Sequence, residues 1–170
     1  ELGFEPICAH VNNRNQAMSF KLYNPKQVEF LPKTSPSGKR VYLRSLCMML
    51  YRAVETVCPG VTIRIEHSIS NGHYCRLTGI EVTDTLIDSL RAEMRRLAEA
   101  DLPLVRDERL TKDVIEIFRR QGLHDKVALL ETTHELYTTF YTLDGLCDSY
   151  YGPLAPSTGH IRVFDLLPYK

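Results

Sequence analysis

The longest regular pattern in the sequence lies between Val41 and Cys58, where apolar residues recur every three or four positions. A repeat of this period predicts a helix with one buried face, and Pro59-Gly60 is expected to end it. The apolar positions of this predicted helix are Leu43, Leu46, Cys47, Leu50, Val54 and Val57.

Two further helices are predicted downstream. One begins near Thr83, whose side chain suits an N-cap, carries Leu86, Leu90, Met94 and Leu97 on one side, and is stopped by Pro103. The other runs from Thr111 to about Gln121, where Gly122 stands in the position of a C-terminal cap.

Alternating patterns predict strands elsewhere. Residues 61–66 alternate apolar and polar side chains, and Asn71-Gly72 is typical of a hairpin turn leading into residues 73–77. Residues 135–142 and 161–167 have the same character, with loops at Asp144-Gly145 and between Gly152 and Gly159. The mixture of helices and hairpin strands indicates the α+β class.

The N-terminal part is less regular. Residues 4–12 and 17–31 are short apolar runs broken by Asn12-Asn13 and Asn24-Pro25, which predicts a small piece of β-sheet. Residues 32–40 are rich in Pro, Ser and cations, and we interpret them as a linker.

Composition narrows the functional classes. The chain has 21 Lys and Arg and 21 Asp and Glu, so its net charge is zero, which argues against a main role in non-specific nucleic-acid binding. Five scattered cysteines without metal-ligand spacing favour free thiols in a reducing compartment.

No signal peptide or long apolar run is present, so we expect a cytoplasmic protein without membrane contact. Because the sequence opens at Glu1 without Met, we expect it to be a segment of a longer polypeptide.

The common chemical motifs are missing from the sequence. Ser37-Gly38-Lys39-Arg40 does not make a P-loop, because Lys33 stands where the first glycine is needed and Arg40 follows the lysine in place of Ser or Thr. No two of the six histidines have the i, i+4 spacing of helical metal ligands, so no metal site is predicted. The loop from Gly152 to Gly159 offers the hydroxyls of Ser157 and Thr158, and it either positions a ligand or only turns a corner.

Several stretches together resemble a known family. They are residues 53–77, which include SNGHY, residues 83–106, which include ADLP, residues 114–130, and residues 152–166, which contain GP followed by PSTG. Residues 42–169 thereby resemble the editing domain shared by threonyl- and alanyl-tRNA synthetases, and residues 12–39 resemble the closing half of a TGS domain, a β-grasp module. The resemblance implies a partial TGS segment over residues 1–35, followed over residues 36–170 by an editing-like domain, in which an antiparallel sheet packs with two long helices.

The residues that do chemistry in this family are replaced here. Editing domains carry an HxxxH pair on the first helix and a Cys…His pair near the late GP loop; these positions fall on Arg44 and Met48, and on Tyr150 and Leu154. Lys126 matches a lysine near the family's site. Met48 and Leu154 cannot move protons, Arg44 stays protonated, and Tyr150 acts as a base only if its pKa falls several units from about 10. Deacylation by the family's route is therefore not expected.

A second resemblance concerns the setting of this segment. The combination of a TGS piece with Asp148-Ser149-Tyr150-Tyr151-Gly152-Pro153-Leu154 is similar to the N-terminal region of bacterial uridine-kinase-like nucleoside kinases. That similarity implies a P-loop kinase domain following in the same chain, with ATP and magnesium bound there and no cofactor in the segment itself.

We therefore predict a non-catalytic binding or regulatory module with an editing-type cleft. The candidate ligand-binding residues are Arg44, Met48, Lys126, Tyr150, Leu154, Ser157 and Thr158. The ligand would be a small molecule or an RNA 3′ end, and an oligomer is possible. Three alternatives stay open: a filled pocket with Met48 and Leu154 in the core, a deacylase that uses Tyr150, Lys126 or His73, and a structural or dimerisation module.

Overall fold

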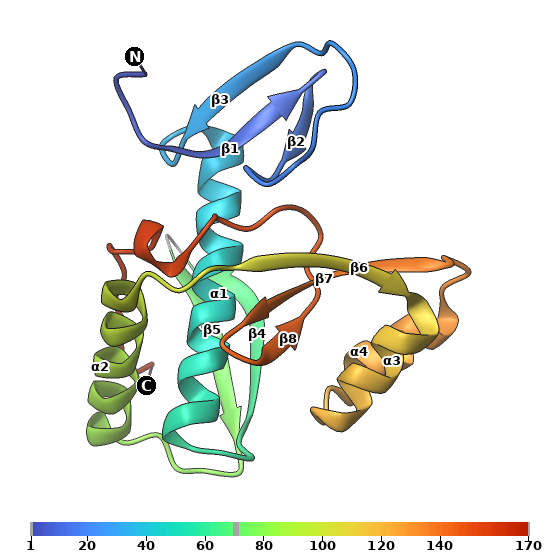
Figure 1. Ribbon diagram of the computed structural model, residues 1–170. Helices are drawn as coiled ribbons and strands as arrows, with labels where there is room; N and C mark the ends of the chain where they lie inside the picture. The colour runs from blue at the N-terminus through green and yellow to red at the C-terminus, as the bar shows by residue number, and fades with distance from the viewer. Residues whose placement is uncertain (1, 70–71, 170) are drawn as a thin grey trace.

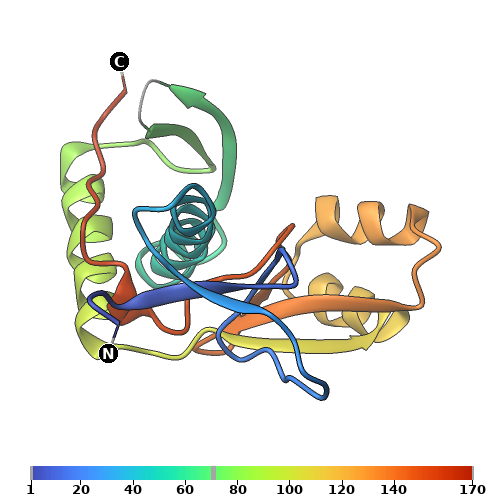
Figure 2. The ribbon, with the colours of Figure 1, turned by 90° about the horizontal axis from the view of Figure 1, so that it is seen from above.

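The computed structural model describes residues 2–69 and 72–169 and has the predicted α+β architecture. Its two longest helices, α1 (Pro36–Val57) and α2 (Asp84–Ala100), lie side by side, and the hairpin of β4 (Thr62–Ile69) and β5 (Gly72–Thr78) packs beside α1 (Figures 1 and 2). All strand pairs are antiparallel. No helix of the described part is long and apolar enough to span a bilayer.

A small sheet precedes α1, as the N-terminal pattern predicts. Its strand order is β2-β1-β3, formed by Arg14–Gln16, Pro6–Val11 and Val28–Pro32, and it stands above the N-terminal end of α1 (Figure 1). Ile7, Cys8 and Leu31 of this sheet share the main apolar core with α1 and α2. The division of the chain at residue 35 stays a prediction.

A long two-stranded ribbon carries the second group of helices. β6 (Val105–Leu110) and β7 (Tyr137–Leu143) run out from the body, and α3 (Thr111–Arg120) and α4 (His124–Thr132) pack at the far end (Figures 1 and 2). The short β8 (Leu146–Asp148) pairs with β7 across a two-residue turn at Asp144 and Gly145, both of which have positive φ, as their predicted turn requires. A separate apolar core of Val114, Phe118, Val127 and Phe140 stabilises this end.

The predicted linker at residues 32–40 is wrong in its second half. Ser35 caps α1 by accepting a hydrogen bond from the amide of Gly38 at 3.0 Å, and Pro36 occupies the first turn, where its missing N–H costs nothing. Gly38 is the tight position of this turn, because a Cβ there would overlap the carbonyl oxygen of Pro32 and lie 2.9 Å from the Cα of Lys33. The helix therefore begins five residues before Val41.

The predicted strand at residues 161–167 is also wrong. A 3₁₀ turn (Thr158–His160) is followed by an irregular segment whose backbone is held by side chains. The hydroxyl of Tyr42 accepts from the amide of Val163 and donates to its carbonyl, both at 2.8 Å, and Arg91 donates to the carbonyl of Leu166 at 2.6 Å. These side chains take both backbone groups of Val163 and the carbonyl of Leu166, which a strand would have used for pairing.

The other predicted elements are confirmed, with small shifts. Thr83 caps α2 by accepting from the amide of Leu86 at 3.2 Å, and Gly122 follows α3 with a φ of 74°. β4 and β5 form the predicted hairpin, although Asn71 of its turn lies outside the described residues. The pattern missed β6, whose residues are mostly charged, and the short helix α4.

Candidate functional site

A cleft of about 820 Å³ separates α1 and the β4–β5 hairpin from the helical end of the ribbon. One wall is formed by Leu43, Arg44, Cys47 and Tyr51 of α1, with residues 62–66 of β4 and His73 of β5. The opposite wall is formed by residues 122–126, Asp148 and Tyr150. α1 and the hairpin pack in the main apolar core, and so does Tyr150 of the opposite wall, whereas Leu123 packs in the second core.

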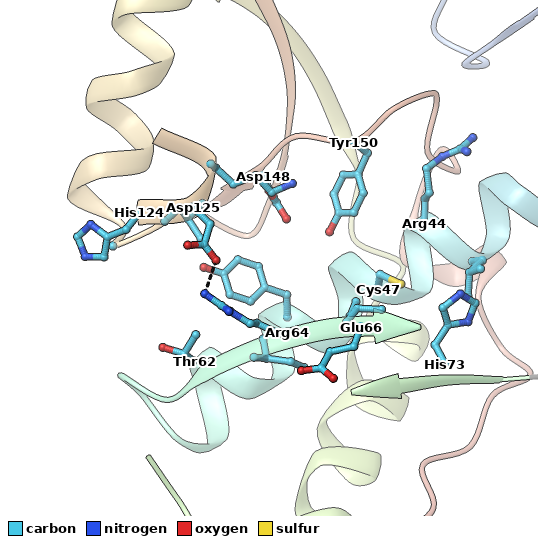
Figure 3. Close-up of a pocket in the computed structure, with 17 residues that line it drawn as sticks. Arg44, Cys47, Thr62, Arg64, Glu66, His73, His124, Asp125, Asp148 and Tyr150 are labelled. Atoms are coloured by element: carbon cyan, nitrogen blue, oxygen red, sulfur yellow. Dashed lines mark hydrogen bonds and ion pairs between the residues drawn. The ribbon is translucent and has the colours of Figure 1, made fainter. Parts of the chain in front are cut away.

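Tyr150 and Asp148 lie at the centre of the second wall. Figure 3 shows the Tyr150 hydroxyl pointing toward Cys47 and the Asp148 carboxylate pointing into the same space. Asp148 is almost fully buried, accepts a hydrogen bond from the amide of Ser149 at 2.7 Å and lies 3.2 Å from the ammonium group of Lys126. The negative charge of Asp148 is therefore already compensated by Lys126.

Lys126 is held in place by three contacts. Besides its ion pair with Asp148, its ammonium group donates to the carbonyl of Ser149 at 2.7 Å and lies 5.4 Å from the centroid of the Tyr150 ring. A cation over an aromatic face is attracted by the ring quadrupole. Lys126 and Tyr150 therefore lie beside each other, and Lys126 has little capacity left for a ligand anion.

 Lys126 and Tyr150 both belong to the second wall of the cleft.

Arg44 points away from the centre of the cleft, as Figure 3 shows. Its guanidinium donates from Nε and Nη2 to the carbonyl of Pro153, at 3.1 and 3.0 Å. Gly152 has a φ of 124°, and a Cβ at this position would lie 2.9 Å from Nη2 of Arg44. Arg44 therefore ties the loop after β8 to α1, and only a glycine allows this close approach.

Met48 and Leu154 are core residues, which corrects their predicted place in the lining of the cleft. Their exposed fractions are 0% and 1%, and both belong to the main apolar cluster. The backbone of Leu154 is fixed as well, because its amide donates to the Tyr141 hydroxyl at 3.2 Å, and the next amide, of Ala155, donates to Ser45 at 2.7 Å. Both side chains pack the interior beneath the cleft.

Ser157 and Thr158 lie away from the cleft, at the C-terminal end of α2. The Thr158 hydroxyl donates to the carbonyl of Leu97 at 2.6 Å and accepts from the amide of Leu102 at 2.8 Å. Ser157 donates to the carboxylate of Asp101, which also accepts from the amide of Gly159 at 3.0 Å. Of the two open interpretations of this loop, the contacts favour the structural one.

Burial is the main cause of the pKa shifts of the side chains that line the cleft. It raises the pKa of Tyr150 well above its usual value, with the Asp148 carboxylate adding in the same direction. Burial likewise raises the pKa of Cys47 and of Tyr51 to about 12, and Asp148 contributes to both. These three protic groups are therefore neutral near pH 7, and none is poised to act as a nucleophile or base.

The residues that the sequence pattern missed are Cys47, Tyr51, Arg64, Asp125 and Asp148. Cys47 and Tyr51 follow Arg44 at intervals of three and four, which places all three on one helix face. Asp148 precedes Tyr150 by two positions, the spacing that returns to the same side of an extended chain. Both spacings can be read from the sequence. The approach of Arg64 to Asp125 cannot, because the two residues are 61 positions apart in the chain.

Arg64 and Asp125 form an ion pair across the cleft at 2.6 Å, from β4 to the first turn of α4 (Figure 3). Both side chains are largely exposed, so we expect the pair to contribute less than about 1 kcal/mol to stability. The ion pair between Arg64 and Asp125 nevertheless connects the two walls of the cleft directly.

The raised pKa values predict a characteristic response to alkaline pH. Cys47 has a usual pKa of 9.0 and Tyr51 of 10.0, and both rise to about 12 in the fold, so the native state keeps protons that the unfolded chain releases. We expect the free energy of unfolding to be unaffected by these groups below pH 9 and to fall as the pH rises from there toward 12. Urea unfolding across this range, with Cys47→Ser and Tyr51→Phe as comparisons, measures the effect. Wild-type and variant profiles that run parallel would contradict it.

Within residues 2–69 and 72–169, no three His, Cys, Asp or Glu side chains are grouped to hold a metal ion. All five cysteines are free thiols; Cys8 and Cys58 are buried and the others partly buried.

Comparison with known proteins places this geometry in context. No protein-family model matches the chain. Curated proteins do match it along nearly its whole length. The chain is similar to threonine--tRNA ligases. The protein of that name from Syntrophotalea carbinolica is 27% identical over 170 residues, which cover 97% of this chain and 26% of the relative.

Two further relatives agree with this result. The threonine--tRNA ligase of Carboxydothermus hydrogenoformans is 27% identical over 168 residues, and that of Citrifermentans bemidjiense is 28% identical over 161 residues. The chain spans about a quarter of the length of the curated relatives that it matches. The similarity to threonine--tRNA ligases includes both the N-terminal sheet and the walls of the cleft, since it covers 94–98% of the chain.

Proposed function

We propose that this domain is a non-catalytic binding module that retains the cleft of an aminoacyl-tRNA editing domain. The observation that carries the proposal is the state of the four positions where such domains place their reactive side chains. Tyr150 is held protonated, Arg44 is bonded to the carbonyl of Pro153, and Met48 and Leu154 are buried in the core. None of these groups can activate a water molecule near neutral pH.

The shape and chemistry of the cleft support a binding role. Its volume of about 820 Å³ suits a ligand the size of a nucleoside or an aminoacyl nucleoside. Its walls combine apolar side chains, such as Leu43 and Ile63, with the aromatic rings of Tyr51 and Tyr150. A planar heterocycle packed on such rings gains apolar burial and stacking, while the polar rim fixes its orientation. The ligand class that we propose is a small molecule with a heterocyclic ring or the 3′ end of an RNA.

The setting that we propose is the N-terminal part of a uridine-kinase-like nucleoside kinase. The support is the stretch from Asp148 to Leu154, which resembles that region of those kinases. In this setting a P-loop kinase domain follows in the same chain and binds ATP and magnesium. A GxxxxGK[ST] motif downstream would support this setting, and class II synthetase motifs there would contradict it.

Ligand binding is tested by thermal unfolding in the presence of nucleotides, amino acids and short RNAs. A ligand at 100 times its dissociation constant is expected to stabilise the domain by about 2.7 kcal/mol. Tyr150→Ala should abolish the stabilisation because it removes the aromatic surface, whereas Tyr23→Ala, at a tyrosine that is 83% exposed outside the cleft, should leave it unchanged. Absence of stabilisation by every compound would count against the proposal.

The same protein tests the enzymatic alternative. Incubation with mischarged tRNA should give no hydrolysis above the uncatalysed rate. Hydrolysis that disappears in Lys126→Ala, Tyr150→Phe or His73→Ala would instead establish a deacylase with rearranged chemistry, because these three side chains line the cleft.

A further inference from the structure

Arg44 carries a charge that no carboxylate compensates among residues 2–69 and 72–169. Its guanidinium is partly buried, and its two hydrogen bonds go to a neutral carbonyl, that of Pro153. Burial lowers its pKa, and the positive charge of Arg40 lowers it further. Buried arginines are usually paired with an anion, so a partly buried arginine without one is suited to bind an anionic ligand.

Arg40 lies one helical turn before Arg44 on the same face of α1. Residues at this spacing are neighbours, with about 5–6 Å between their Cβ atoms. Arg40 is exposed, and its one side-chain contact within the described residues is a 3.1 Å hydrogen bond from Nη2 to the hydroxyl of Ser37. Two like charges at this spacing destabilise a helix by a few tenths of a kcal/mol in the absence of a counter-ion.

Two lysines extend the positive charge beyond this pair. Lys39 precedes Arg40 on α1, and the backbone of Lys33 packs against the first turn of the helix beside Gly38. Both side chains are exposed. Glu29 approaches this region from β3, but it lies 3.8 Å from the ring of His10. We call Lys33, Lys39, Arg40 and Arg44 the basic cluster.

We propose that the basic cluster is a phosphate-binding site, in which the guanidinium groups of Arg40 and Arg44 bind one phosphate group between them. Planar guanidinium groups donate paired hydrogen bonds to phosphate oxygens, and a bound dianion removes the repulsion between the two arginines. Lys33 and Lys39 add exposed positive charge at the same end of α1, so the matching ligand class is a nucleoside diphosphate, a pyrophosphate or a polynucleotide end. This site borders the cleft, because Arg44 lines both, but the Arg44 guanidinium points away from Tyr150 (Figure 3).

Calorimetric titration of the whole chain tests the site. The probes are inorganic phosphate, pyrophosphate, a nucleoside diphosphate and a 5′-phosphorylated oligonucleotide, with the unphosphorylated nucleoside as the reference. We expect the phosphorylated probes to bind and the nucleoside to fail. Arg40→Gln should weaken the phosphorylated probes roughly tenfold, because it removes a charge-assisted pair of hydrogen bonds. The control is Lys112→Gln, which removes an exposed cation on α3 and should change nothing.

Arg44→Lys supplies an independent measurement. It keeps the charge but loses the Nη1 donors, which the bonds to Pro153 leave free for a phosphate, so we expect weaker binding at an unchanged circular dichroism spectrum. Equal affinity in wild type and Arg40→Gln, or no binding of any phosphorylated probe, would overturn the proposal. Preference among the probes then distinguishes a nucleotide from a polynucleotide as the source of the phosphate. Because Tyr150 is not among the proposed phosphate-binding residues, Tyr150→Ala should bind these probes as the wild type does, which keeps this result distinguishable from binding of the proposed cleft ligand.

Discussion

Replacing Gly38 by alanine should lower the free energy of unfolding by about 2–3 kcal/mol, although alanine is the better helix former by about 1 kcal/mol. The reason is the tight turn at the start of α1. A Cβ at residue 38 would overlap the Pro32 carbonyl oxygen, and this oxygen is fixed because it accepts from both the amide and the hydroxyl of Ser35, at 3.1 and 2.9 Å. The substitution must therefore break the turn and the cap together.

Urea unfolding of Gly38→Ala against wild type measures this effect. Gly3→Ala is a matched control, because a Cβ at residue 3 has no atom within 4 Å. We expect the control to leave the midpoint unchanged. A Gly38→Ala variant that is as stable as wild type, or more stable, would show that the turn from Pro32 to Ser35 can move away at little cost.

The second large effect is expected at Leu154, where Leu154→Ala should cost about 3 kcal/mol of unfolding free energy. The side chain is 1% exposed, and the surrounding backbone cannot collapse into the cavity because Arg44 and Tyr141 both hold the loop. Leu154→Met, which conserves volume, should cost less than about 1.5 kcal/mol. Denaturant unfolding of the two variants gives the comparison.

Leu154→Ala also distinguishes a core residue from a ligand contact. If Leu154 only packs the core, the folded variant should bind a cleft ligand with wild-type affinity at a temperature well below its unfolding midpoint. A small loss of stability together with a large loss of affinity would instead return Leu154 to the lining of the cleft.

Helices with a clear period were predictable from sequence, and segments held by side chains were not. The apolar stripe predicted α1 except for its first five residues, and the cap at Thr83 predicted the start of α2. The segment at residues 161–167 alternates like a strand, but Tyr42 and Arg91 take its backbone hydrogen bonds. These contacts join residues more than 70 positions apart, so no local pattern could reveal them.

The candidate site was predicted in part. Family resemblance led to Arg44, Lys126 and Tyr150, and all three are among the residues that line the cleft. It could not show that Arg44 turns toward Pro153, because this depends on the absence of a side chain at Gly152. It also could not show that Asp148 lies beside Lys126, a contact that requires α4 and β8 to pack together.

The presence of two apolar cores in one fold has an evolutionary consequence. Substitutions at exposed positions of β6, such as Val105, can alter the spacing of the walls without touching a residue that lines the cleft, and they leave both cores intact because the core residues of the ribbon lie on β7. A lineage can therefore explore ligands of new sizes through mutations remote from the binding surface, at little risk to folding.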